Sequence, residues 1–269
     1  MTIKTITPPT TEPVTLQEVK DQLRIVHDEE DDLITAYIVA ARRYIENVLT
    51  YRTFIEKELH LSIDEFPSRK LPTEINLPYP PAQEVMSISY KDKDGEETTI
   101  SDDKYIVDTD SEPARIVPAS GESWPTEELY PLGAVKIRYK AGYSTYTGEV
   151  NVTNGGENGD PYVNVSWQSG DKFNTDWQAG QRIIINHKPY KIKEVTDEEN
   201  LTIQSSTEEE LSVVDYSVNF VPEELKQAVL MLAAHFYEHR EPVAIGATVE
   251  KLPLAVNALT EAYRAWGGG

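Results

Sequence analysis

The spacing of apolar residues changes twice along this chain, and the change limits what it can fold into. From residue 14 to 50, and again from 222 to 266, apolar side chains recur three and four positions apart, as on one face of a helix. Between residues 53 and 220 they alternate with polar residues or form short runs between turn residues, which is typical of strands. The sequence therefore predicts an α+β fold. A small helical bundle of two N-terminal and two C-terminal helices would accompany a strand-rich middle region.

Local signals place the boundaries of these elements. Thr15 and Glu18 form a capping-box pair, and acidic residues crowd positions 28–32, where a helix dipole favours negative charge. Pro222 suits a first helical turn. The main domain is predicted at 14–143 and 221–266, with helices at 15–26, 29–50, 222–241 and 254–266 and a β region at 53–143. Residues 1–13 are predicted to be an extended N-terminal arm.

The alternation within the β region also predicts which side chains face inward. Residues 135–140 alternate apolar and basic side chains, so one face of this strand should be buried and the other wet. In residues 85–90, Met86, Ile88 and Tyr90 are expected to share one face.

Residues 144–220 are predicted to be an inserted, small all-β module. Three of its aromatic residues, Trp167, Phe173 and Trp177, have two interpretations. They can form the core of a small barrel, or they can form a platform that binds sugars. The core is the preferred interpretation, because a barrel of this size needs large side chains to fill it.

Composition restricts the classes of partner. The chain has 25 basic and 46 acidic residues, a net charge of −21, and lacks the basic patch expected of a DNA-binding protein. It contains no cysteine, which excludes disulfides and thiolate metal sites and fits a reducing compartment or a particle assembled in one. No run approaches the length of a membrane span, so no membrane partner is expected.

One stretch of the third predicted helix has two competing interpretations. His235, Glu238 and His239 match an inverted zinc-protease signature, for which Glu250 or Glu261 could supply a third ligand. The motif has only three fixed positions, and chance matches are common. A helix-packing seam is therefore preferred, and neither a metal site nor any cofactor is predicted. The seam residues are Leu225, Val229, Leu232 and Phe236.

Several stretches, taken in order, resemble the phage head–tail connector (adaptor or neck) family of long-tailed phages. They are 14–25, 28–32, 40–46, 77–81, 85–90, 112–116, 135–143 with its Lys-Ala-Gly-Tyr ending, and 221–241. In simpler members of that family the Ala-Gly-Tyr strand leads almost directly into the Val-Pro-Glu-Glu-Leu helix. The module at 144–220 is thus a departure.

This resemblance implies a structural virion protein and no catalysis. It implies a homo-oligomeric, dodecameric ring that binds the portal protein and a tail-side stopper or tail-terminator protein, and that surrounds passing double-stranded DNA without specific binding. It also implies location in the virion neck after assembly in the bacterial host cytoplasm. The C-terminal segment is the candidate portal contact, through Leu254, Leu259, Tyr263 and Trp266.

Two alternatives belong to other functional classes. One is a carbohydrate-binding or adhesin-like virion module centred on 144–220, which depends on exposed aromatic side chains. The other is a zinc hydrolase that uses His235, Glu238 and His239. Buried aromatic side chains would argue against the carbohydrate-binding module. Histidines without a third ligand nearby would argue against the zinc hydrolase.

Overall fold

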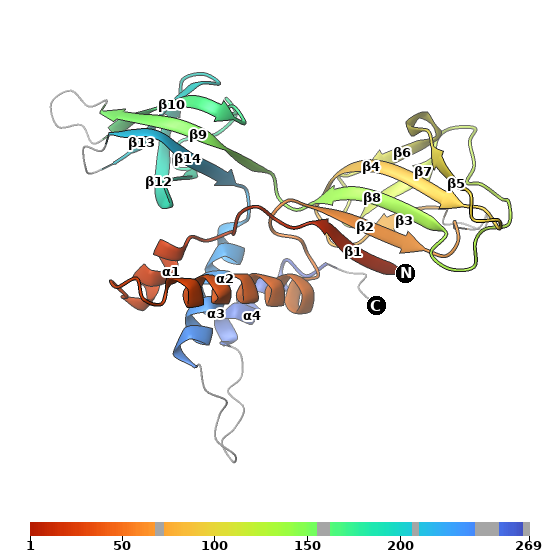
Figure 1. Ribbon diagram of the computed structural model, residues 1–269, viewed down its shortest axis with the longest axis horizontal. Helices are drawn as coiled ribbons and strands as arrows, with labels where there is room; N and C mark the ends of the chain where they lie inside the picture. The colour runs from red at the N-terminus through yellow and green to blue at the C-terminus, as the bar shows by residue number, and fades with distance from the viewer. Residues whose placement is uncertain (68–72, 155–161, 206–209, 240–252, 266–269) are drawn as a thin grey trace, which may run out of the picture. The chain divides into compact units, whose positions relative to one another are not determined.

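The computed structural model describes residues 1–67, 73–154, 162–205, 210–239 and 253–265 (Figure 1). Within these ranges it has four α-helices and extensive β-sheet, which confirms the predicted α+β class. The chain divides into two compact units. Unit 1 comprises residues 1–12, 42–143 and 251–269, and unit 2 comprises residues 13–41 and 144–250. None of the described helices is long and apolar enough to cross a membrane.

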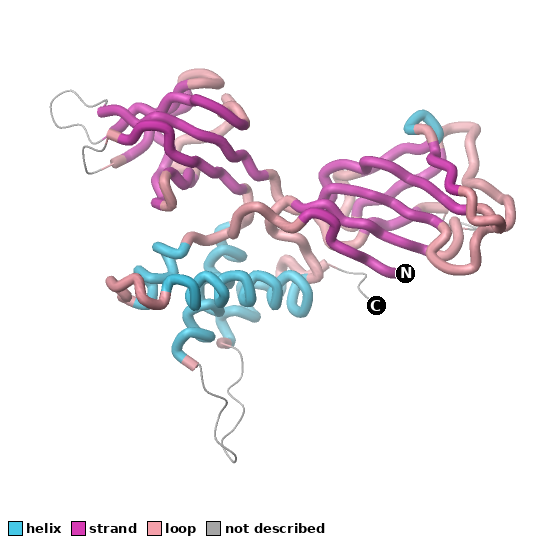
Figure 2. Tube along the Cα trace, in the orientation of Figure 1, coloured by secondary structure: helices cyan, strands magenta, loops and turns pink. Residues whose placement is uncertain are grey.

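Unit 1 contains two antiparallel sheets that share one apolar core (Figure 2). The first has the strand order β1-β2-β8-β4-β5 and the second β3-β7-β6. The strands are β1 (Thr2–Thr7), β2 (Lys57–Ile63), β3 (Ile75–Leu77), β4 (Ala82–Lys91), β5 (Glu97–Ile100), β6 (Tyr105–Asp108), β7 (Ala114–Pro118) and β8 (Val135–Ala141). A short 3-10 helix, η2 (Asp102–Lys104), precedes β6.

Strand β8 is central in the larger sheet, and its side chains alternate as the sequence predicts. Val135, Ile137 and Tyr139 are fully buried, while the basic residues between them are partly or fully exposed. Tyr139 lies opposite Leu59 of β2, and its hydroxyl donates to the carbonyl of Pro78 at 2.6 Å. Burial raises the pKa of the Tyr139 hydroxyl far above its ordinary value, so Tyr139 stays a neutral hydrogen-bond donor.

Within the predicted N-terminal arm, Thr2–Thr7 form the extended strand β1, which pairs with β2 at the edge of the sheet. One expectation for this unit is wrong. Met86 does not share the buried face of Ile88: it is 41% exposed, whereas Ile88 is fully buried. A β-bulge between Val85 and Ser87 inserts Met86 as an extra residue and breaks the alternation at this point.

Unit 2 contains a closed barrel with the strand order β10-β13-β12-β11-β14-β9. Its strands are β9 (Thr145–Asn154), β10 (Tyr162–Gly170), β11 (Arg182–Ile185), β12 (Lys188–Val195), β13 (Asn200–Gln204) and β14 (Leu211–Asn219). Inward-facing Val, Ile and Leu side chains from every strand surround the barrel interior. All six strands lie within the range predicted for the inserted module, and the division into a main domain and that module stays a prediction.

The helices are shorter than predicted. They are α1 (Leu16–Leu23), α2 (Asp31–Tyr44), α3 (Glu223–Glu238) and α4 (Leu254–Glu261), and a π-helix, η1 (Ile45–Thr50), follows α2 directly. The capping box at Thr15 is present as predicted, but Arg24 adopts a left-handed conformation with φ 59° and ends α1 there. Tyr51, with φ 51°, ends η1. The four helices are confirmed, and their assembly into a single bundle stays a prediction.

Candidate functional site

Helix α3 carries the four residues predicted to form a packing seam. Leu225, Val229 and Leu232 are fully buried, and the ring centroid of half-buried Phe236 lies 6.3 Å from that of Tyr37 on α2. The helix also packs against α1. Fully burying an aliphatic side chain contributes roughly 1.5–3 kcal/mol, so these contacts hold α3 to the N-terminal part of unit 2.

His235, Glu238 and His239 lie at the C-terminal end of α3. The two imidazole centroids are 4.3 Å apart, the backbone N–H of His239 donates to the His235 carbonyl at 3.1 Å, and Glu238 is exposed. Across the described ranges, no three His, Asp or Glu side chains are grouped closely enough to hold a metal ion. Of the two suggested third ligands, Glu250 lies outside the described residues and Glu261 is an exposed residue of α4.

Among its described residues, the candidate portal-contact segment presents one large apolar side chain that is mostly exposed. Leu254 is 83% exposed at the first position of α4, whereas Leu259 and Tyr263 are half-buried. Val256 is completely buried, and α4 packs against η1. Trp266, the fourth residue of this prediction, lies outside the described residues. Leu254 is therefore the described residue of this segment best placed to meet a partner.

A buried carboxylate organises the junction between η1 and the first sheet of unit 1. Glu46 is 1% exposed, accepts from Arg42 Nη1 at 2.9 Å and from the backbone N–H of Phe54 at 2.7 Å, and pairs with Lys57 Nζ at 3.1 Å. Arg42 in turn donates from Nε to Glu12 at 2.6 Å. The paired charges compensate one another in a dry environment, as buried charges require.

The buried ion-pair network around Glu46 was not predicted from the sequence. Burial alone opposes the charge of the Arg42 guanidinium, but its hydrogen bonds to Glu12 and the charge of Glu46 outweigh burial and raise the pKa of Arg42. The sequence does indicate the pair of Arg42 with Glu46, because the two residues are four positions apart on a predicted helix with a continuous apolar stripe. The π-helical turn that carries Glu46 has no comparable signal.

A second network of buried charge joins two of the stretches that carry the family resemblance, 112–116 and 135–143. Arg52 is 6% exposed; its Nη1 and Nη2 donate to Glu112 at 2.8 and 2.5 Å, and its Nε donates to the carbonyl of Tyr263 at 3.0 Å. The Tyr143 hydroxyl lies 3.4 Å from Nη1. The hydrogen bond from Arg52 lowers the pKa of Glu112 despite partial burial of that carboxyl.

The glycine of the Lys-Ala-Gly-Tyr ending is required by close backbone contact. Gly142 has φ +120°, and a Cβ placed there would lie 2.6 Å from backbone atoms of Ile55 and Glu56. Its N–H donates to the Pro81 carbonyl at 2.8 Å. The stretches at 77–81, 112–116 and 135–143 therefore meet at one structural junction of unit 1.

The barrel aromatic residues are core residues. Phe173 and Trp177 are 1% and 5% exposed, with ring centroids 6.0 Å apart, and Tyr216 packs on Phe173 at 5.4 Å. Trp167 is half-buried, and Lys172 Nζ lies 5.3 Å from its ring centroid. The preferred interpretation of these residues as a barrel core is confirmed for Phe173 and Trp177, which are too buried to serve as a sugar platform.

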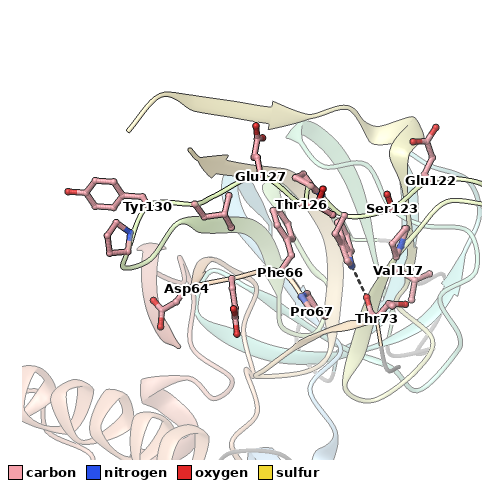
Figure 3. A pocket seen from close by; sticks show the side chains of 16 residues that line it. Asp64, Phe66, Pro67, Thr73, Val117, Glu122, Ser123, Thr126, Glu127 and Tyr130 are labelled. Atoms are coloured by element: carbon pink, nitrogen blue, oxygen red, sulfur yellow. Dashed lines mark hydrogen bonds between the residues drawn. The ribbon is translucent and has the colours of Figure 1, made fainter. Parts of the chain in front are cut away.

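Unit 1 also has an open hollow of about 720 Å³ at one end of its sheets (Figure 3). Phe66 and Trp124 stack 5.3 Å apart along it, and Trp124 Nε1 donates to the carbonyl of Thr73 at 2.7 Å. Asp64 and Glu122 lie toward opposite ends of the hollow (Figure 3). The hollow combines aromatic walls with an acidic rim, which suits a cationic or apolar partner group better than an anionic one.

Together these features define the molecule as an α+β protein with two β-rich units. Its described polar clusters are ion pairs that hold sheets, helices and loops together. Residues 13–114 match the family model of the phage gp6-like head–tail connector protein, which confirms the resemblance predicted from the sequence.

Solved structures share the fold over the whole chain. A chain of the neck of an empty GTA particle, computed with C6 symmetry, is 20% identical, with a TM-score of 0.58. A chain of the virion of a native gene transfer agent particle is 20% identical, with a TM-score of 0.56. A third, from the neck of a native GTA particle computed with C12 symmetry, is 19% identical, with a TM-score of 0.53. Each comparison covers 100% of this chain and 99% of the other, so the fold likeness includes the barrel. No curated protein sequence matches the chain.

Proposed function

We propose that this chain is a structural head–tail connector of a phage or phage-like particle, without enzymatic activity. The observation that carries the proposal is the family match over residues 13–114, together with a full-length fold likeness to chains from particle necks. The connector forms a ring of twelve copies, in keeping with the C12 symmetry of one of those necks. It lies between a portal protein and a tail-side stopper or terminator protein in the virion, after assembly in the host cytoplasm.

The acidic surface has a use in such a ring. With 46 acidic and 25 basic residues, a channel wall built from this chain would repel DNA phosphates. Double-stranded DNA would then pass without adhering to the wall. A map of the assembled ring that shows a neutral or basic channel would refute this part of the proposal.

The exposed end of α4 is the proposed portal contact. Leu254 is 83% exposed, so Leu254→Asp should leave the stability of the chain within about 0.5 kcal/mol of wild type. The same change should weaken portal binding about tenfold or more, because a charge would replace a buried aliphatic group. Val213→Asp, on an exposed barrel residue, is the matched control. Equal portal affinity for both variants contradicts this contact.

The overall proposal is tested with the purified full-length chain. Its mass is measured by light scattering alone and with a portal protein, and the samples are imaged by electron microscopy. Rings of the chain, or a ring of the chain on the portal, are the expected result. A chain that stays monomeric and does not bind the portal contradicts the proposal.

A further inference from the structure

Unit 2 has an open concavity of about 840 Å³ where the barrel meets the start of α3. Arg182, Lys191 and Lys226 line it, and the first two are direct partners across β11 and β12. Like charges directly opposite on neighbouring strands repel. Glu18 pairs with Arg182 and Glu223 with Lys226, so Lys191 is the lining cation that lacks a carboxylate partner among the described residues. The concavity therefore has a local excess of positive charge on a strongly acidic chain.

The same concavity has unsatisfied polar atoms and apolar walls. Arg182 Nε and Asn219 Oδ1 are buried without a hydrogen-bond partner in the described structure, and Asn219 is only 6% exposed. Both atoms are closed off from solvent, so they add polarity to the wall of the concavity without themselves contacting an occupant. Tyr190 and Phe220 supply apolar surface beside them, and Phe220 is 39% exposed. A peptide segment with an aliphatic side chain next to a carboxylate fits this chemistry.

The loop between α1 and α2 has the complementary chemistry. Val26 is 95% exposed, and the carboxylate side chains of Asp28 and Glu29 that follow it are 86% and 80% exposed. Asp28 pairs with Lys20 at 2.6 Å and Glu29 with His27 at 2.8 Å, and both carboxylates remain open to solvent. A single exposed aliphatic residue is ordinary on a protein surface. Here, however, it stands beside two carboxylates, in the combination that the concavity accepts.

A copy of the chain cannot insert this loop into its own concavity. Glu18, in the first turn of α1, lines the concavity, whereas the loop begins after Leu23 at the other end of that helix. Eight helical residues span about 12 Å. In Figure 1 the loop lies at the end of the helices away from the connection between β14 and α3. A loop that fills this concavity must therefore come from another copy of the chain.

We propose that the α1–α2 loop of one copy binds the concavity between β11, β12 and α3 of a second copy. Val26 packs against Tyr190 and Phe220, and the loop carboxylates approach Lys191. Such a contact is heterologous, because each copy inserts one loop and receives another, and its repetition can close a ring. This inference rests on the proposed ring and names the contact between its subunits.

The absence of cysteine from the chain allows a direct test by disulfide trapping. The test chain carries Val26→Cys together with Gln204→Cys, which lies on the concavity wall opposite Lys191. Under mild oxidation it should give a ladder of covalent multimers on a non-reducing gel. Each single variant should give dimers at most. The control pair is Val26→Cys with Val213→Cys, an exposed barrel position that does not line the concavity.

A second measurement needs no cross-link. Val26→Asp should weaken self-association about tenfold or more, measured by mass photometry across a dilution series, because one buried aliphatic side chain is lost from the contact. Since Val26 is exposed in the single chain, its thermal melting should not change. Val213→Asp is the matched control. Lys191→Glu should also weaken association, and addition of Glu29→Lys should restore part of it.

The outcomes of these experiments distinguish failure of the proposed loop contact from failure of the proposed ring. Wild-type rings with no ladder above the control pair, and no effect of Val26→Asp, reject this contact and leave the proposed ring standing. A wild-type chain that stays monomeric and gives no ladder rejects both. A ladder that ends at a fixed size supports both, and that size gives the number of subunits.

Discussion

Unit 1 and the barrel of unit 2 bury different chemistry. Unit 1 encloses Arg42, Glu46 and Arg52, each at most 6% exposed, and these charges link η1, the sheets and the C-terminal segment. The barrel of unit 2 is filled by apolar and aromatic side chains such as Phe173 and Trp177. A buried ion pair tolerates little change in geometry, whereas an apolar core mainly requires volume. The difference indicates that unit 1 is specified by directional contacts and the barrel by packing.

The largest expected loss of stability tests whether packing of apolar volume specifies the barrel. Phe173→Ala should destabilise the barrel by about 4 kcal/mol, because it leaves a cavity against Trp177 and Tyr216. Urea unfolding followed by tryptophan fluorescence and circular dichroism measures the loss. Phe173→Leu, which keeps most of the volume, should cost about 1.5 kcal/mol. Similar losses from both substitutions would show that volume does not determine barrel stability.

The next largest loss of stability tests whether buried ion pairs specify unit 1. Glu46→Gln should cost about 3 kcal/mol, because Lys57 and Arg42 lose their shared buried counter-charge. The control is Glu84→Gln, whose pair with Lys140 is at the surface and should contribute at most about 0.5 kcal/mol. Unfolding free energies from urea titration compare the two variants. A loss at Glu46 no larger than at Glu84 would contradict a structural role for the buried network.

Substitutions at two glycines of unit 1 distinguish the cost of a steric clash from the cost of a strained backbone conformation. Gly142→Ala should cost about 2 kcal/mol, since the new Cβ would meet the backbone of Ile55 at a positive φ. Gly121 has φ +84° but open space around a Cβ, so Gly121→Ala should cost only about 1 kcal/mol. Thermal and urea unfolding measure both. Equal costs would mean that the junction can relax around the added methyl group.

The smallest expected change in stability, from loss of the Arg52–Glu112 ion pair, depends on pH. Arg52 lowers the pKa of Glu112 below its ordinary value of 4.5, so the pair stabilises the fold above that pH and loses this contribution as pH falls through the lowered pKa. The Glu112 side chain is 47% exposed, so Glu112→Gln should cost less than about 1 kcal/mol at neutral pH. The difference from wild type should shrink below pH 4.5. Glu96→Gln, on an exposed side chain, is the control. A difference that is independent of pH contradicts this linkage.

Local patterns predicted much of the fold. The capping box at Thr15, the alternation in β8 and the apolar stripe of α3 are each carried by residues a few positions apart, and the structure contains all three elements. The aromatic core of the barrel was also a sequence-based prediction. The errors are at Met86 and at Arg24, where a bulge and a left-handed residue depend on neighbours distant in the sequence or on a single backbone conformation.

The sequence by itself determined the fold class, most of the elements and the resemblance to head–tail connectors, because periodicity, capping and turn chemistry act over a few residues. Only the tertiary structure decided what the resembling stretches do. Arg52 meets Glu112 and Tyr143 across 60 and 91 residues of chain, and the loop at Val26 and the concavity beside Lys191 become complementary only once the barrel and helices are built. Long-range pairing of this kind has no local signal, because the contact follows from how the strands are connected and packed.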